Sequence, residues 1–299
     1  MGKASGRSVE ADGELAQTSR FELSYIPVPE QLAHHVTTFY YFRCEEAELN
    51  EIQPAAVGQL ALFPRGEGEI IFRDGTSDRS HEVNLLSPVS VAANFVVDGP
   101  FHAIGAALTP LGWAELTGLH AGEHANRLYA AADYLGEDIG RLGAELCAAY
   151  RDGTMEVEAC VEALGQCIAS LLRPLSDEHR KLISLTADWL SGDFNPEIDE
   201  LFAASRYSRR QVQRLVDQYF GLPPTALRRK YRALRAAAMF AQPDLPPETE
   251  AMVRESFYDQ PHLIREIRLF AGRTPARLSD DPDSYLHEML DLRNLRELR

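Results

Sequence analysis

Two stretches of the chain, 51 residues apart, carry the same pattern, and this duplication limits what the C-terminal half can fold into. The stretches are YSRRQVQRLVDQYFGLPP (207–224) and YDQPHLIREIRLFAGRTP (258–275). Four aligned positions are identical and three more are apolar in both copies: Tyr207/Tyr258, Arg214/Arg265, Gly221/Gly272 and Pro224/Pro275, then Val212/Leu263, Val216/Ile267 and Tyr219/Phe270. Average residue usage gives about one identity in eighteen positions by chance. We infer that one helical unit occurs twice.

The first copy has the start signals and the two faces of an amphipathic helix. Ser208 stands just before it and Gln211 follows three residues later, which is the capping-box spacing. The apolar positions mark a buried face, and Arg210, Gln213 and Arg214 fall on the opposite side. Together with the preceding stretch IDELFAASRY, the pattern predicts a helix-turn-helix unit whose second helix can enter a major groove. There, arginine can donate two hydrogen bonds to guanine, and glutamine can bind adenine.

A long helix is predicted between the two units, over residues 225–241. Seventeen residues at a 1.5 Å rise span roughly 25 Å, near the roughly 34 Å between successive major grooves on one face of a duplex. A rigid spacer of that length suits two groove-reading helices on one chain. Its basic side chains are expected on phosphates or in surface ion pairs, and these two interpretations stay open: Arg228, Arg229, Lys230, Arg232 and Arg235.

The charge is unevenly distributed. The whole chain carries a net charge of -15, but residues 199–239 hold nine Lys or Arg against three Asp or Glu, a local charge of +6. Residues 244–278 hold five against six, a local charge of -1. A basic segment in an acidic chain is a localised site for a phosphate backbone, because screening limits the field to roughly 10 Å. The split also motivates the hypothesis that the acidic N-terminal domain docks on the basic reader and competes with DNA.

Residues 176–278 resemble the DNA-binding domain of the AraC/XylS family of bacterial transcription regulators, whose two helix-turn-helix units are joined by a long helix. The stretch SFYDQPHLIREIRLFAGRTP (256–275) is similar to the family's signature, G-[FY]-x-D-Q-x-H-F-x-R-x-F-R-x-x-x-G-x-T-P. The resemblance implies groove contacts by Arg210, Gln213 and Arg214 in the first unit and by Gln260, Pro261, His262 and Arg265 in the second. The predicted DNA-binding positions also include Arg209, Arg228, Arg229 and Arg268.

Other roles stay open for some of these positions. Arg214 and Arg265 have a second interpretation as phosphate contacts or braces, Gln260 as support for the helix start, and His262 as a packing residue. The chain also departs from the family pattern, because Ser256 replaces the usual glycine and would cost on the order of 1 kcal/mol if a positive φ were required there. We therefore expect the second unit to be a weaker reader or an architectural element.

In the N-terminal part, runs rich in β-branched and aromatic residues predict short strands, which Gly, Pro, Asp and Asn separate. The predicted strands are 34–42, 58–64, 68–75, 90–100 and 102–108. It resembles, more weakly, a poorly characterised sheet-plus-helices domain of one branch of the family, which there senses a ligand or dimerises. Aromatic strand residues are the candidates for a ligand pocket, although an aromatic stripe is more often plain core: Tyr40, Phe42, Phe63 and Phe72.

The expected fold class is α+β, with a barrel- or sandwich-like N-terminal domain and an all-α double helix-turn-helix domain. A helix is predicted from Pro110 to a stop at Gly118, and from about residue 137 the apolar period changes to that of helices. The predicted boundaries are a flexible tail over 1–20, a sensory or dimerisation domain over 21–135, a helical connector over 136–175, the DNA-binding domain over 176–280, and a helical C-terminal tail over 281–299.

No pattern of an enzyme or a metal site stands out. On a strand, His34 and His35 would point to opposite faces. His120 and His124 have helical ligand spacing, but a glycine lies between them and no acidic third ligand is evident. The four cysteines form no CxxC pair and are expected to be reduced core thiols. We expect no catalytic activity, no cofactor and no metal.

The sequence thus predicts a DNA-binding transcriptional regulator, an activator or a repressor, that reads two successive major grooves with helices near 209–219 and 260–270 under the control of an N-terminal ligand. The alternative is a small-molecule-binding protein whose helix-turn-helix pair binds proteins instead of DNA. Expected partners are double-stranded DNA, a small-molecule effector, a second copy of the chain and, for an activator, RNA polymerase. The start of the sequence has no signal-peptide pattern and no run of eighteen apolar residues occurs, so we expect a cytoplasmic protein without a membrane partner.

Overall fold

Alternation of apolar and polar residues builds one antiparallel sheet from the N-terminal part of the chain. The structure is a computed structural model that describes residues 14–17, 20–242, 244–278 and 284–290. Within these residues the strands are β1 (Glu14–Gln17), β2 (Phe21–Ile26), β3 (Val36–Cys44), β4 (Glu48–Gln53), β5 (Gln59–Ile71), β6 (Ser77–Arg79), β7 (Val83–Leu86), β8 (Ala93–Leu108) and β9 (Leu128–Ala130).

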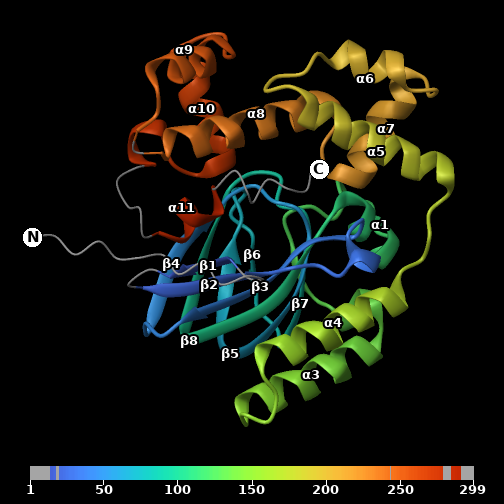
Figure 1. The fold of residues 1–299 in the computed structure, drawn as a ribbon, viewed down its shortest axis with the longest axis vertical. Coiled ribbons are helices and arrows are strands. Elements are labelled where there is room, and N and C mark those ends of the chain that lie inside the picture. Colours follow the sequence, from blue (N-terminus) through green and yellow to red (C-terminus); the bar gives the residue numbers. More distant parts are fainter. Residues whose placement is uncertain (1–13, 18–19, 243, 279–283, 291–299) are drawn as a thin grey trace, which may run out of the picture.

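The long strand β8 gives the sheet its curvature. The strand order is β1-β2-β3-β8-β5-β7-β9, with β4 also paired to β8 and β6 to β5. Residues 101–108 of β8 pair with β3, whereas residues 93–98 pair with β4, and β5 follows β8 along its other edge. Because β8 changes its partner halfway, the sheet curls round an interior (Figure 1).

Two strand predictions need correction. The stretch 58–64 and the first part of the stretch 68–75 belong to one strand, β5, which ends at Ile71. The register shift between Leu62 and Glu67 lies within the strand and includes the Arg-Gly-Glu-Gly segment that has the composition of a turn. The stretches 90–100 and 102–108 likewise join as β8. Strand β3 begins at Val36, so His34 and His35 lie in a turn and the opposite-face argument does not apply to them.

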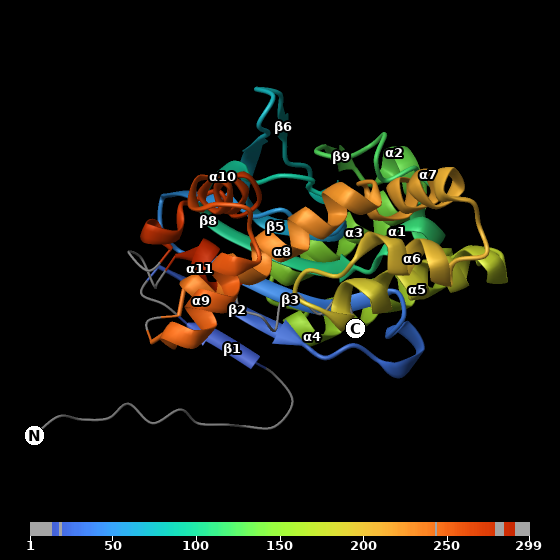
Figure 2. The same cartoon turned by 90° about the horizontal axis from the view of Figure 1, so that it is seen from above.

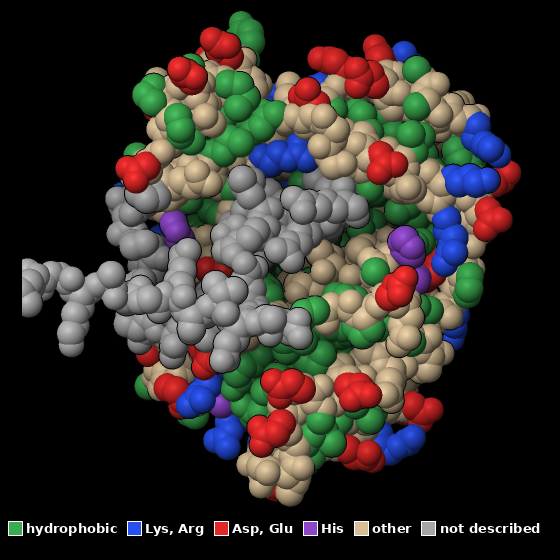
Figure 3. Space-filling model, in the orientation of Figure 1, with side chains coloured by type: hydrophobic (Ala, Val, Ile, Leu, Met, Phe, Trp, Pro, Cys, Tyr) green, Lys and Arg blue, Asp and Glu red, His purple; other side chains and the backbone are tan. Residues whose placement is uncertain are grey.

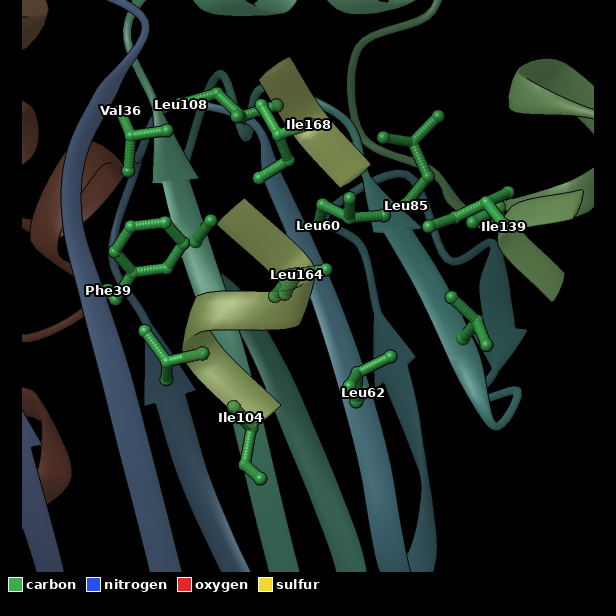
Figure 4. Close-up of a cluster of buried hydrophobic side chains, with 14 of the residues drawn as sticks. Val36, Phe39, Leu60, Leu62, Leu85, Ile104, Leu108, Ile139, Leu164 and Ile168 are labelled. Carbon is green, nitrogen blue, oxygen red and sulfur yellow. The ribbon is translucent and has the colours of Figure 1, made fainter. Parts of the chain in front are cut away.

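Two helices cover the outer face of the sheet. Helices α3 (Glu137–Arg151) and α4 (Val157–Leu171) confirm the change to a helical period after residue 136. Leu164 and Ile168 of α4 point into a cluster formed by apolar side chains of the sheet, including Phe39, Leu60 and Ile104 (Figure 4). This outer core leaves the inner face of the sheet free to line a separate space.

The helix predicted after Thr109 is confirmed as α1 (Pro110–Thr117). The Thr109 side chain accepts a hydrogen bond from the Gly112 backbone N–H, and Gly118 ends the helix in the left-handed region at φ 68°. A short helix, α2 (Ala132–Leu135), follows β9. All four cysteines are free thiols, and Cys167 is only half-buried.

In the described residues after α4 the regular elements are all helices, so the α+β class is confirmed. The helices are α5 (Asp177–Gly192), α6 (Ile198–Ala204), α7 (Arg209–Phe220), α8 (Pro224–Phe240), α9 (Pro247–Glu255), α10 (Gln260–Ala271), η2 (Pro275–Arg277) and α11 (Tyr285–Met289), with η1 (Glu30–Leu32) in the N-terminal part. Of the two predicted tails, residues 14–17 pair with β2 as β1, residues 285–289 form α11, and residues 1–13, 18–19, 281–283 and 291–299 lie outside the described residues. Within the described part, no helix has the length and apolarity to cross a membrane.

A buried carboxylate joins the sheet to the helical part. Glu115 of α1 is 1% exposed and bonds His35 Nε2 at 2.8 Å and Arg180 Nε of α5 at 2.6 Å. The backbone N–H of Leu175 donates to the same carboxylate at 2.9 Å. Burial alone would raise the pKa of Glu115, but the hydrogen bonds from Arg180 and Leu175 hold it below its ordinary value. The carboxylate is therefore charged and fixes where α5 begins.

Replacing Glu115 by Gln is expected to lower the free energy of unfolding at neutral pH by about 1–3 kcal/mol, since a neutral amide no longer balances Arg180. The pKa of Glu115 is lower in the folded protein than in the unfolded protein. Its contribution to the free energy of unfolding is therefore complete at a pH above its pKa in the unfolded chain, and is lost as the pH falls through its pKa in the folded protein. Urea unfolding at neutral and acidic pH measures this, and the difference between the two proteins should shrink in acid. Glu162→Gln, on the exposed side of α4, is the control, and an equal loss there would contradict the assignment.

Candidate nucleic-acid interface

Helix α7 is fixed in place by its cap and its apolar stripe. The Ser208 side chain and Gln211 form the predicted capping box, with the Ser208 backbone N–H donating to Gln211 Oε1 at 3.0 Å. Val212 and Val216 are fully buried and Tyr219 is 3% exposed, in a cluster shared with α5, α6 and α8. Both predictions are confirmed, and the buried stripe determines which face of the helix remains in solvent.

The opposite face of α7 is basic and open. Arg210, Gln213 and Arg214 are exposed, and within the described residues their side chains make no hydrogen bond or ion pair. Arg209 differs, because its Nη2 atom lies 2.9 Å from Asp199 Oδ1 and its guanidinium lies over the Phe202 ring of α6. The open cationic edge of the first unit therefore runs from Arg210 to Arg214.

Helix α10 repeats this arrangement with a different cap. Asp259 Oδ1 accepts from the His262 backbone N–H at 2.7 Å, so Asp259 and not Gln260 caps the helix. Ser256 has φ -73°, so the serine at the position of the family's glycine carries no left-handed strain. Four of the five predicted contact positions are exposed and His262 is half-buried; the exposed ones are Gln260, Pro261, Arg265 and Arg268.

A buried carboxylate binds α10 to the linker helix α8. Glu266 is 1% exposed, and its two oxygens accept from Arg229 Nε and Arg232 Nη2, both at 2.5 Å. His262 Nε2 lies 3.1 Å from the same carboxylate, which favours the packing role for this histidine. The alignment of the two repeats could have indicated that Glu266 is buried, because Glu266 occupies the position of the buried Leu215 in the first unit.

The linker helix is less exposed than its basic pattern suggests. Lys230 and Arg232 are 2% and 7% exposed, so the expectation of phosphate contacts or surface pairs is wrong for them. Their cationic groups bind Ala56 O and Glu266, respectively, because α8 is enclosed by both units and by the sheet domain. Arg228 donates to Pro196 O at 3.3 Å, and Arg229 binds Glu266.

The sheet domain holds both recognition helices at equivalent positions. Ala121 N–H donates to Gln218 O of α7 at 2.8 Å, and Ala92 N–H donates to Leu269 O of α10 at 3.0 Å. Gln218 and Leu269 are 51 residues apart, which is the spacing of the repeat. The last carbonyls of a helix have no partner inside the helix, so these loops cap the two ends. A third bond, from Ala55 N–H to Phe270 O at 2.8 Å, strengthens the hold on α10.

The glycines that end the two helices sit against the same domain. Gly221 and Gly272 both adopt a positive φ, of 79° and 87°. A Cβ at Gly272 would lie 2.5 Å from Ile52 Cγ2, and one at Gly221 would contact Pro88. Glycine is therefore required at Gly272 by both backbone conformation and close approach.

The two units lie at opposite ends of α8 in both ribbon views (Figures 1 and 2). In the space-filling view they form two separate lobes above the sheet domain, with acidic side chains scattered on both (Figure 3). Within the described residues, the acidic N-terminal domain leaves Arg210 and Arg214 uncovered, and it contacts α7 and α10 at their C-terminal ends through backbone hydrogen bonds and apolar side chains. The geometry therefore does not support competition for the arginine edge by acidic side chains.

The inner face of the sheet encloses a cavity of about 180 Å³. Three of the four aromatic candidates, Tyr40, Phe42 and Phe63, line it, whereas Phe72 is buried outside its lining. His120 and His124 lie outside any helix, and the described residues contain no cluster of three or more His, Cys, Asp or Glu suited to a metal.

The helix-turn-helix region matches a known family model, described as a helix-turn-helix domain, over residues 201–280. By sequence alone, no curated protein matches the chain. Among solved structures, ToxT from Vibrio cholerae is similar at 9% identity and a TM-score of 0.47, over 83% of this chain and 97% of that one. ToxT with bound unsaturated fatty acid aligns at 8% identity and a TM-score of 0.45, over 88% and 95%. Oxalate decarboxylase from Bacillus subtilis aligns at 14% identity and a TM-score of 0.27, over 36% and 31%.

The capped recognition helices, the linker between them and the family match agree on the same segment. Residues 201–280 of this chain form a helix-turn-helix domain of the AraC type.

Proposed function

We propose that the protein is a sequence-specific DNA-binding transcriptional regulator that inserts α7 and α10 into successive major grooves. The observation that carries this proposal is the edge of α7, where Arg210, Gln213 and Arg214 are exposed without a partner in the described part of the chain. A helix held rigidly by its cap and its buried stripe presents these donors in a fixed geometry, as base recognition requires.

The second reader contributes through Gln260, Arg265 and Arg268, while His262 braces it. The cluster around Glu266 couples its orientation to α8, so α10 moves with the linker helix. Contacts with a second copy of the chain and with RNA polymerase stay predictions.

Control by a small molecule follows from the position of the cavity. Residues 53–57 form part of the cavity wall, and the same segment is hydrogen-bonded to the helical domain. The Ala55 N–H donates to Phe270 O of α10, and Ala56 O accepts from Lys230 of α8 at 3.1 Å. Leu234 of α8 also lines the cavity. An occupant that shifts this wall therefore changes how the second reader is held, and this shift is the proposed link between ligand and DNA.

Replacing Arg210 or Arg214 by Ala is expected to weaken binding to a selected duplex by about 1–3 kcal/mol, since each would lose a base contact. Fluorescence anisotropy with the full-length protein measures the affinity. Arg141→Ala is the matched control, because Arg141 is an exposed arginine of α3 whose one partner among the described residues is Asp138. Unchanged affinity in both α7 variants would reject α7 as a reader.

The predicted phosphate contacts of Arg228 and Arg229 are tested by salt dependence. If these arginines neutralise phosphates, the double alanine variant should bind all sequences less tightly and show a shallower slope of log K against log salt. If these arginines only stabilise the protein through Pro196 and Glu266, the double variant binds DNA less tightly but the slope of log K against log salt is unchanged. That result would reject the phosphate role.

Glu266→Gln is expected to destabilise the second unit by on the order of 3 kcal/mol, because Arg232 is left buried without a carboxylate. Thermal unfolding measures the loss, and footprinting should show weaker protection at the half-site read by α10. Glu250→Gln, which removes an exposed ion pair with Arg254 on α9, is the control and should change little. Full protection of both half-sites by the Glu266 variant would contradict the bracing role.

A further inference from the structure

The interior cavity has a chemical character that limits its occupant. Aromatic rings form much of its lining, among them Phe42, Phe63, Phe95 and Phe101. Tyr285 of α11 joins them, with its ring centroid 5.1 Å from that of Phe95 and 5.7 Å from that of Phe42. Such a surface favours flat apolar groups, because aromatic rings pack edge to face or offset against one another.

The described lining offers an anion no cationic partner. Among the described residues that line the cavity there is no Lys, Arg or His, and Glu69 is the one side chain with a formal charge at neutral pH. Lys230 lies outside the lining, behind the wall, where its ammonium group bonds Ala56 O. A carboxylate brought into this space would lose its hydration without gaining a cation, which is strongly unfavourable.

One part of the cavity is polar but uncharged. Gln59 Oε1 accepts from Tyr40 Oη–H at 2.7 Å, and the described residues provide no acceptor for the Gln59 amide N–H groups. Thr37 Oγ1 is buried and has no hydrogen-bond partner in the described part of the chain. Both residues line the cavity, and Gln59 and the neighbouring Thr38 lie opposite the same residue of β8, Ala107. Of these groups, the Thr37 hydroxyl is buried without a partner and the Gln59 side chain is half-buried. A buried polar group without a partner is costly, so this corner favours a ligand that can donate to or accept from these side chains.

We propose that the cavity binds a small uncharged molecule of one or two rings, with one neutral hydrogen-bonding group directed at Gln59 and Thr37. This inference rests on the proposed ligand control and names the class of ligand. The volume of about 180 Å³ fits the size, since an engineered apolar cavity of about 150 Å³ holds benzene. The apolar walls, and the lack of a cationic side chain among the described lining residues, select a neutral compound over the matching acid.

Calorimetric titration of the full-length protein with 2-naphthamide and with 2-naphthoate tests the proposal, because the two probes share shape and differ in charge. We expect 2-naphthamide to bind at least about tenfold more tightly, in line with the desolvation of the carboxylate. Gln59→Leu should weaken 2-naphthamide about two- to tenfold, the effect of one lost hydrogen bond. Equal or tighter binding of 2-naphthoate, or no binding of 2-naphthamide, would overturn the proposal.

Location in the cavity is tested by filling it. Ala103→Leu, at a buried lining position, should abolish 2-naphthamide binding, and Ala251→Leu, at an exposed position of α9, should not. Retained affinity in a folded Ala103 variant would overturn the assignment. DNA affinity of the unsubstituted, ligand-free protein is measured in parallel. If that protein binds DNA but not 2-naphthamide, only the ligand proposal is rejected, and if it binds 2-naphthamide but not DNA, only the reader assignment is rejected.

Discussion

The two backbone hydrogen bonds from Ala121 and Ala92 to equivalent carbonyls of the recognition helices are the contacts on which the rest of the arrangement depends. Helix ends need external donors, and the sheet domain supplies one to each reader at the same position of the repeat. Main-chain donors on packed loops fix both distance and direction. The sheet domain thereby sets how the two readers lie relative to each other, and it leaves their N-terminal halves in solvent.

Two buried carboxylates connect further parts of the molecule. Glu115 joins the sheet to α5, and Glu266 joins α10 to α8. Glu115 pairs with Arg180, and Glu266 pairs with Arg229 and Arg232 of the linker helix. On α7, by contrast, Arg210 and Arg214 are exposed and have no partner in the described part of the chain.

The duplication made the helical half predictable from the sequence. Cap, apolar stripe and glycine stop are local signals, and all three occur at Ser208, Val212 and Gly221 as expected. The sheet was harder to predict, because the glycines in β5 mark a register shift inside one strand and not a turn between two. The burial of Lys230 and Arg232 could not be read from a basic pattern either, since it depends on contacts with segments far away in sequence. The backbone hydrogen bonds by which the sheet domain holds α7 and α10 have no side-chain signature in the sequence, because main-chain atoms make them.

The central claim, that one rigid body holds two readers at a fixed separation, is tested most directly by selecting duplexes from a random library with the full-length protein. The account predicts enriched sequences with two recognition blocks whose centres lie about one helical turn apart, roughly 10 base pairs, at a single spacing. A single block, two blocks at variable spacing, or no enrichment would contradict it.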